Sequence, residues 1–319
     1  MIHVQGLTKR YGDKLALDNV SFDVQLGEVL GLLGLNGAGK STAMNILTGY
    51  IGATSGTVTI DGHDIVREPL EAKRVIGYLP ERLAFYGDMR VREFLDFVCD
   101  LKRVKEGRLE HVASICERVG IADVTSRMIR NLSKGYRQRL GFAQALVGDP
   151  KVLILDEPTA GLDPAQIIEI RSLIQEIGQT RAVMISSHIL SEIQEVCTRV
   201  VVLHEGRVLA DDTPENLGRA ARAAHRVIAL VQGEPEQVQS ALSQLPELKQ
   251  VKVLAQEEPG AYEYIIEGAQ QQDVRADIFR ALAKADLPLL GTRGAETSLE
   301  QIFLRVVGER GGDNTQGRS

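Results

Sequence analysis

The sequence is poor in aromatic residues, in cysteine and in long hydrophobic runs, and each shortage excludes a class of function. Only 4% of its residues are aromatic and none is tryptophan, so few side chains are available to stack on exposed nucleic-acid bases. The formal net charge of −6 also gives no basic surface that would attract a phosphate backbone. We therefore expect no nucleic-acid partner.

Cysteine is limited to Cys99, Cys116 and Cys197. Their wide spacing matches neither a disulfide framework nor a metal-ligand motif, and we interpret them as buried, reduced thiols without a role in the chemistry. Hydrophobic runs are short as well, and none approaches the roughly 18 to 20 residues that span a bilayer. Because the sequence from Met1 also lacks the pattern of a secretory signal, we expect a cytoplasmic protein.

The most informative segment that is present is glycine-rich and reads GLNGAGKST over residues 34–42. It fits G-x-x-x-x-G-K-[ST], a loop whose backbone amides surround nucleotide phosphates, and it stands between an apolar run and a helical pattern. In such a loop Lys40 reaches the β- and γ-phosphates and the Ser41 hydroxyl binds Mg²⁺. The sequence therefore predicts a nucleoside triphosphate site formed by Asn36, Gly37, Ala38, Gly39, Lys40, Ser41 and Thr42. The alternative is an ordinary glycine turn in which Ser41 caps a helix.

A pair of acids, Asp156 and Glu157, follows the apolar run at 152–155 and precedes Pro158. Charges at the end of a buried strand are costly unless they serve a cation or a reaction. Asp156 suits a Mg²⁺ ligand, direct or through water, and Glu157 suits a general base that polarises the attacking water. The alternative is a pair of acids that simply starts a helix before Pro158.

A third candidate is the polar turn NLSKGYRQR at residues 131–139, which leads into an amphipathic helical pattern. It offers the hydroxyl of Ser133, free amides and a helix N-terminus to an anion. Ser133 can equally be a simple helix cap.

The spacing of apolar residues predicts the organisation of the chain. Residues 2–60 read as short strands separated by turns, and the helical spacing from Val91 to about Val147 predicts an inserted helical lobe at about 90–147. Continuous apolar runs at 152–155, 182–185 and 200–203 predict parallel strands with helices on both faces, in a domain that spans residues 1–215.

A second domain is expected at 226–307, where strand and helix patterns alternate as βαββαβ, typical of a small α+β domain. Its last helix would carry the apolar stripe Leu299, Ile302, Phe303 and Val306. We expect this domain to be regulatory or to pair two subunits, because it has no second glycine loop or pair of acids at a strand end. Residues 308–319, with four glycines and no apolar cluster, predict a disordered tail.

Taken in this order, the motifs closely resemble those of the ATP-binding subunits of ABC transporters over about residues 1–215. The resemblance implies an α/β fold of the P-loop NTPase class and of the ABC ATPase type, in which a β-rich lobe embraces the loop, with ATP and Mg²⁺ as cofactors. It also implies a head-to-tail homodimer, in which Ser133 and Gly135 contact the γ-phosphate that the partner's glycine loop holds.

The resemblance assigns three further roles. Tyr11 would stack on adenine, residues 160–163 would contact the partner subunit, and His188 would touch the γ-phosphate. Considered alone, His188 also fits a histidine that caps the end of a strand.

Two departures from the family pattern concern the site. Lys134 and Tyr136 replace a glycine and a glutamine of the usual Leu-Ser-Gly-Gly-Gln, although Ser133 and the amide of Gly135 remain. Glu81 stands where the family usually has a glutamine that senses Mg²⁺ and the attacking water. A carboxylate can still bind Mg²⁺, but it adds negative charge near the phosphates.

These variants and the second domain resemble most the bacterial exporter branch that includes gliding-motility-type and multidrug-type ATPases. This implies an ATPase that powers a separate transmembrane permease, docked near residues 82–89, at the inner face of the cell membrane. Two other functions stay open: a mechanical clamp on nucleic acid or ribosomes, and a nucleotide-gated scaffold with little turnover. The sequence does not identify the transported substrate.

Overall fold

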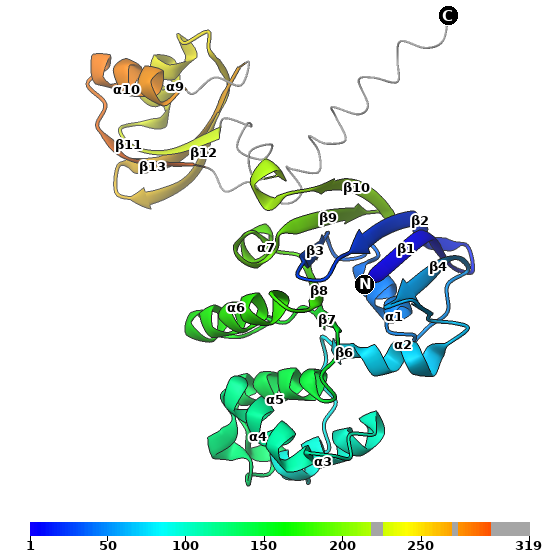
Figure 1. Ribbon diagram of the computed structural model, residues 1–319. Helices are drawn as coiled ribbons and strands as arrows, with labels where there is room; N and C mark the ends of the chain where they lie inside the picture. Colours follow the sequence, from blue (N-terminus) through cyan, green and yellow to red (C-terminus); the bar gives the residue numbers. More distant parts are fainter. Residues whose placement is uncertain (218–225, 270–273, 295–319) are drawn as a thin grey trace, which may run out of the picture. The chain divides into compact units, whose positions relative to one another are not determined.

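The structure is a computed structural model of the chain and describes residues 1–217, 226–269 and 274–294 (Figure 1). The chain divides into two compact units, Met1–Pro214 and Glu215–Ser319, and each contains a hydrophobic core of its own. The three cysteines are free and buried, as the sequence predicts. Within the described ranges, no helix is long and apolar enough to cross a membrane.

An antiparallel sheet opens the first unit, with the strand order β2-β1-β4-β5. Its strands are β1 (Ile2–Tyr11), β2 (Lys14–Val24), β4 (Ser55–Ile60) and β5 (His63–Asp64). The hairpin between β1 and β2 turns at Gly12, whose φ of 56° lies in the left-handed region that glycine adopts without strain. The first two strands are longer than the short strands expected from the sequence. Register shifts interrupt the alternation of apolar and polar residues along them, so the sequence pattern indicates shorter segments.

A six-stranded sheet forms the centre of the first unit, with the order β10-β9-β3-β8-β7-β6. Its strands are β3 (Val29–Leu33), β6 (Ile76–Leu79), β7 (Val152–Asp156), β8 (Ala182–Ser187), β9 (Arg199–His204) and β10 (Arg207–Asp212). All neighbours are parallel except β10, which is antiparallel to β9. The carboxyl ends of β3, β8, β7 and β6 therefore meet at one edge of the sheet, where open α/β sheets bind ligands.

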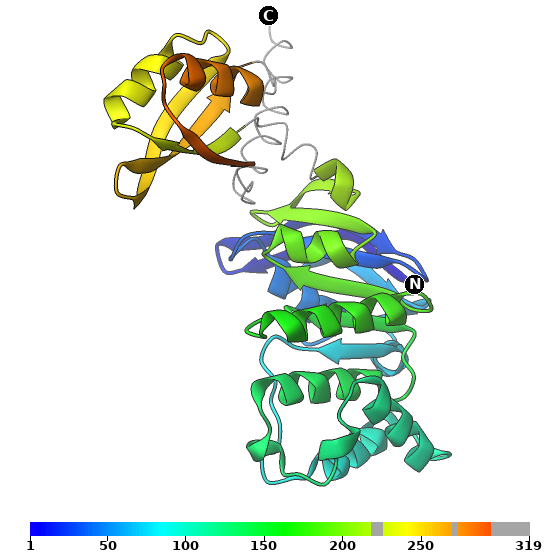
Figure 2. The same cartoon turned by 90° about the vertical axis from the view of Figure 1, so that its left-hand side faces the viewer.

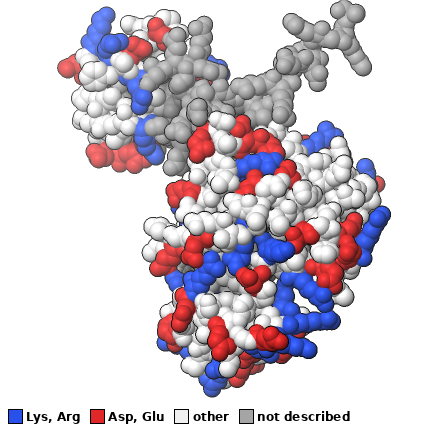
Figure 3. All heavy atoms as spheres, viewed as in Figure 1, with Lys and Arg blue, Asp and Glu red and all other residues white. Residues whose placement is uncertain are grey.

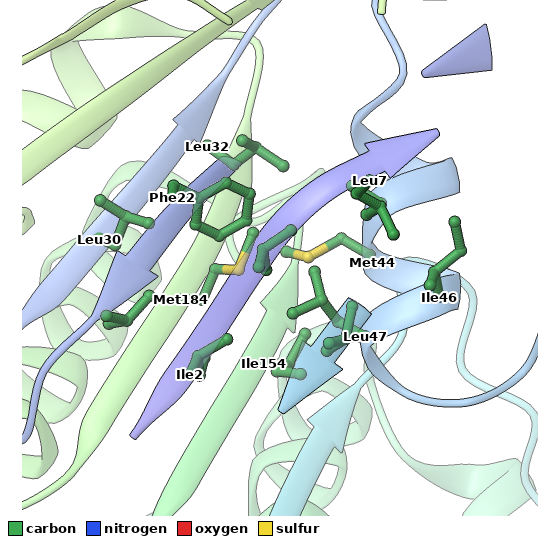
Figure 4. Close-up of a cluster of buried hydrophobic side chains, with 14 of the residues drawn as sticks. Ile2, Leu7, Phe22, Leu30, Leu32, Met44, Ile46, Leu47, Ile154 and Met184 are labelled. Atoms are coloured by element: carbon green, nitrogen blue, oxygen red, sulfur yellow. The ribbon is translucent and has the colours of Figure 1, made fainter. Parts of the chain in front are cut away.

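A hydrophobic core cluster lies between the two sheets and includes the helix that follows the glycine loop (Figure 4). This helix is α1 (Lys40–Leu47), and the next is α2 (Pro69–Val75). Buried side chains of the core shown in Figure 4 are Ile2, Leu7, Phe22, Leu30, Leu32, Met44, Ile46, Leu47, Ile154 and Met184. The other face of the central sheet is covered by α6 (Pro164–Gly178) and α7 (Leu190–Val196), which face the viewer in Figure 2.

The helical segment of the first unit contains α3 (Val91–Lys102), α4 (Arg108–Arg118) and α5 (Lys134–Leu146), with single 3₁₀ turns at Ala122–Val124 and Ile129–Asn131. Figure 1 shows these helices grouped beyond β6. The close approach of α5 to β6 needs a glycine, because a Cβ on Gly141 would lie 2.6 Å from Leu79 Cδ1. Helix α5 is thus packed directly on the strand that leads to Glu81.

The second unit has the βαββαβ order that the sequence pattern predicts. Its elements are β11 (Arg226–Gln232), α9 (Pro235–Ser243), β12 (Leu248–Glu258), β13 (Ala261–Gly268), α10 (Arg275–Lys284) and β14 (Leu289–Gly294). The strands form an antiparallel sheet in the order β12-β13-β11-β14, with a core between the sheet and the two helices. The expected last helix and the tail at 308–319 lie outside the described residues.

Candidate nucleotide-binding and catalytic site

A cleft of about 460 Å³ opens at the carboxyl edge of the central sheet. Among the predicted site residues, those that line it are Tyr11, Asn36, Gly37, Gly39, Lys40, Ser41, Thr42, Glu81, Glu157 and His188. Two others, Ala38 and Asp156, are buried beside these residues in the sequence. The last two, Ser133 and Gly135, are described in the structure but do not line this cleft. The fold therefore brings together residues that are far apart in the sequence. The polar turn at residues 131–139, called the signature turn from here on, stays outside the cleft lining.

The glycine loop owes its shape to two residues with positive φ, Gly37 at 86° and Gly39 at 109°. Space is also limiting at the second position, because a Cβ on Gly39 would lie 2.7 Å from the carbonyl oxygen of Ala16. Helix α1 begins directly after this glycine, at Lys40. The N–H groups of its first turn have no partners within the helix, so they are available to an anion in the cleft.

Lys40 is a buried cation, with only 6% of its surface exposed. Its Nζ donates hydrogen bonds to the carbonyl oxygens of Gly34, at 2.6 Å, and Leu35, at 3.4 Å. Burial lowers the pKa of Lys40, and the neighbouring carboxylates, Glu157 foremost, oppose that change. The loop thus holds its own lysine in place, with its charge next to the acids of the cleft.

Asp156 is the last residue of β7 and lies 6% exposed beside its partner in β8, Ser186. The Ser186 hydroxyl donates a short hydrogen bond to Asp156 and accepts one from the backbone N–H of Glu157, at 3.0 Å. Burial raises the pKa of Asp156, although the bond from Ser186 favours its ionised form. One serine therefore fixes both acids that the sequence identifies.

Glu157 and His188 both line the cleft and form a pair there. Nδ1 of His188 lies 3.0 Å and 3.1 Å from the two carboxylate oxygens of Glu157. Glu157 has a φ of 48°, a strained value for a residue with a side chain, and such values are concentrated at functional sites. Burial raises the pKa of Glu157, with the His188 hydrogen bond opposing it, and a raised pKa makes a carboxylate a better proton acceptor.

Three oxygen-bearing side chains at this edge could hold a divalent cation: Ser41, Glu81 and Asp156. A hydroxyl and carboxylates are oxygen ligands of the kind that Mg²⁺ prefers, and Mg²⁺ usually completes its shell with phosphate oxygens and water. No cluster of three or more histidine, cysteine or acidic residues suited to a metal is found in the described part of the chain. The residues present therefore fit Mg²⁺ bound together with a nucleotide rather than a metal site built from protein ligands alone.

The signature turn is held against the loop that follows Glu157. Ser133 caps α5 by accepting a hydrogen bond from the backbone N–H of Tyr136 at 3.3 Å, so the capping interpretation describes its contact within the chain. A Cβ on Gly135 would lie 2.7 Å from Nε2 of Gln166. The Lys134 side chain lies directly over Gly161. Gly161 also has a φ of 68°, a left-handed value that favours glycine, whereas a side chain at position 135 would require Gln166 to move.

Four polar residues near the site were missed by reasoning from the sequence: Gln138, Thr159, Ser187 and Glu192. Nε2 of Gln138 donates to the carbonyl oxygen of Pro158 at 2.7 Å. Thr159 and Ser187 both donate to Glu192. No motif identifies these residues, and the only general signal is that buried polar groups need partners.

Comparison with known proteins agrees with this geometry. Residues 17–160 match the family model for ABC transporters. The chain is 36% identical to an uncharacterized ABC transporter ATP-binding protein, sll0415, from Synechocystis, over 93% of this chain and 79% of that protein. It is 38% identical to the bacitracin transport ATP-binding protein BcrA from Bacillus licheniformis, over 70% of this chain and 72% of that one. A solved ATP-binding subunit of an ABC transporter matches with a TM-score of 0.64 and 29% identity, over 69% of this chain and 92% of that chain.

The chain therefore belongs to the family of ABC transporter ATP-binding proteins. The predicted fold class, a P-loop NTPase of the ABC ATPase type, is confirmed. The predicted function is also confirmed: the chain is an ATP-binding and ATP-hydrolysing subunit that powers transport. Neither of the two alternatives, a clamp acting on nucleic acid or ribosomes and a nucleotide-gated scaffold with little turnover, is favoured.

The raised pKa of Glu157 predicts a pH-dependent stability effect of Glu157→Gln. The folded protein holds this proton at higher pH than the unfolded chain, whose ordinary value is 4.5, so the ionised side chain costs stability at neutral pH. The glutamine variant should gain Tm at pH 8 without nucleotide, and the gain should shrink as the pH falls through the raised pKa to below 4.5. Scanning calorimetry across this range tests it, with Glu117→Gln, an exposed acid on α4, as the control. A gain that is equal at every pH would contradict the assignment.

Proposed function

We propose that the cleft binds ATP with Mg²⁺ and that Glu157 is the general base for hydrolysis. The observation that supports this most strongly is the pairing of Glu157 with His188 in the same cleft as Lys40 and the glycine loop. Lys40 and the loop amides would bind the β- and γ-phosphates, and Tyr11 would stack on adenine. Lys9 Nζ already lies 5.0 Å from the centre of the Tyr11 ring, which leaves the opposite face for a base.

The proposed reaction is attack of water on the γ-phosphorus, which forms one P–O bond and breaks the bond to the β–γ bridging oxygen, so that ADP leaves with that electron pair and phosphate is released. Glu157 takes a proton from that water, while His188 keeps the carboxylate oriented and contacts the γ-phosphate. Bound Mg²⁺ would offset the negative charge of the phosphates, and Ser41, Asp156 and Glu81 are the residues proposed to hold it. The charge of Lys40 would act on the same phosphates.

Glu157→Gln should keep ATP affinity but lower turnover by about 10²-fold or more, because the base is lost. Lys40→Ala should instead weaken ATP binding, since the lost ammonium would face the phosphates. Phosphate-release assays and nucleotide titrations of the purified variants distinguish the two effects. Near-normal turnover in Glu157→Gln would remove Glu157 from this role, and turnover close to background in the wild type would favour the nucleotide-gated scaffold.

We also propose that ATP joins two copies of this chain head to tail. Ser133 and Gly135 do not line the cleft of their own subunit, so a phosphate contact would have to come from a second copy. The hydroxyl of Ser133 accepts a bond as a helix cap, yet its own hydrogen stays available to donate to a phosphate oxygen.

Glu157→Gln should therefore shift from monomer to dimer at saturating ATP, as seen by light scattering. Ser133→Tyr should block this shift without changing ATP affinity, because the bulky ring fills the proposed interface. Ser133→Thr, which keeps the hydroxyl and the cap, is the matched control. A Glu157→Gln protein that stays monomeric at saturating ATP would contradict the dimer.

A surface on the helical segment supports docking of a separate permease, which would hold the protein at the inner face of the membrane. Tyr86 is 60% exposed and meets Phe97 edge to face, with ring centres 5.8 Å apart. Leu101 on the same helix as Phe97 is 67% exposed. Tyr86 lies within the expected docking segment at 82–89, Phe97 and Leu101 lie on α3, and apolar patches of this kind mark interaction sites. Export is the direction we propose, by analogy with the exporter branch.

Figure 3 shows acidic and basic side chains interspersed on one face of the first unit, unlike a surface built for nucleic acid.

We propose that the second unit is regulatory or pairs two subunits. It has its own core, and its sequence contains no second glycine loop. Truncation after Pro214 should therefore leave ATP affinity unchanged and weaken self-association or stimulation by the permease. Titration calorimetry, sedimentation and ATPase assays with the permease check the three properties. Unchanged self-association together with unchanged stimulation would contradict the proposal.

A further inference from the structure

One carboxylate oxygen joins the two loops that carry Glu157 and His188. Oε2 of Glu192, in the first turn of α7, accepts a hydrogen bond from Thr159 Oγ1 at 2.9 Å and another from Ser187 Oγ at 3.0 Å. Thr159 comes two residues after Glu157, and Ser187 comes immediately before His188. Glu192 itself does not line the cleft formed by the described residues.

The surroundings make this bridge strong. Thr159 is 7% exposed and Ser187 is 2% exposed, so little water competes for the two hydroxyls. Hydrogen bonds to an ionised acceptor are stronger than neutral ones, and this effect grows where water is excluded. Ser187 Oγ also accepts a bond from the backbone N–H of Ile189 at 3.0 Å, which fixes the turn that presents His188.

Other bonds hold the Glu157 backbone, from Ser186 and through Gln138 at Pro158, but the side chains of Glu157 and His188 are positioned chiefly by their contact with each other. Glu157 has a strained backbone, and such a conformation persists only when its surroundings impose it. His188 is half exposed and projects from a loop, with Nδ1 on Glu157. A change in the separation of the two loops would therefore alter the 3.0 Å contact between His188 and Glu157 first.

We propose that Glu192 is a positioning residue for hydrolysis. Through its bonds to Thr159 and Ser187 it keeps Glu157 and His188 at hydrogen-bonding distance from each other. The inference rests on the proposed role of Glu157 as the base and extends it to a residue outside the lining of the cleft. Glu192 would set the rate of the chemical step while leaving nucleotide binding to the glycine loop.

Glu192→Ala removes the acceptor, and we expect kcat to fall about 10- to 100-fold, as for a small misplacement of a catalytic group, with KM for ATP changed less than about twofold. Glu192→Gln keeps an acceptor oxygen and should restore most of the rate. The matched control is Glu195→Ala on the same helix, whose carboxylate pairs with Arg171 and is 62% exposed, and which should keep wild-type kcat. Equal loss in the alanine and glutamine variants, or a rise in KM that accounts for the loss, would overturn the proposal.

A second arm separates this inference from the role of Glu157. If Glu192 acts through Glu157, then Glu192→Ala should reduce single-turnover hydrolysis by less than about twofold in a Glu157→Gln background. Losses that multiply in the double variant would overturn the proposal and leave Glu157 as the base. Normal turnover of Glu157→Gln alone would instead refute the proposed function.

Circular dichroism and Tm measurements control for folding. If Glu192→Ala does not fold, Thr159→Val and Ser187→Ala each remove one hydroxyl of the bridge and take its place. Each should lower kcat with KM unchanged, and wild-type kcat in both would overturn the proposal.

Discussion

The site depends on a buried ammonium group that shares one sheet edge with buried carboxylates. Lys40 loses most of its hydration, and two backbone carbonyls of its own loop replace part of it. Burial lowers the pKa of Lys40 and raises those of Asp156 and Glu157, so each charge is costly, and the ammonium and the two carboxylates partly compensate each other. Such a cluster is poised for an anion and a cation together, which is what a nucleotide with its metal provides.

The topology of the central sheet creates this cluster. Four adjacent parallel strands end at the same edge: β3 leads to the glycine loop, β6 to Glu81, β7 to the acid pair and β8 to His188. The register of β7 and β8 places Asp156 beside Ser186, and that serine then binds both acids. The loops that emerge from these strands are tied to α5 and α7, so the helices that surround the edge control its geometry.

Much of this could be predicted from the sequence, because the information is local. The glycine loop, the acid pair and the apolar runs of the central strands are contiguous, and their chemistry follows from residue type and spacing. The pairing of His188 with Glu157 could not be derived in this way, since 31 residues and a helix separate them. Gln138 and the contact of Thr159 with Glu192 were missed for the same reason, because 20 and 33 positions separate the partners. In the second unit, β12 runs from Leu248 to Glu258, and its apolar residues are concentrated between Val251 and Leu254. The remainder of that strand is mostly exposed and polar and carries no hydrophobic alternation.

The account's central claim is that the cleft recognises the β- and γ-phosphates of a nucleotide through Lys40 and the loop amides. Calorimetric titration of the full chain with ATP, ADP and AMP, each with Mg²⁺, tests it most directly. The account predicts that ATP and ADP bind and that AMP, which lacks both phosphates, binds at least about 100-fold more weakly, since each lost charge-assisted contact is costly. An affinity for AMP equal to that for ATP would contradict it.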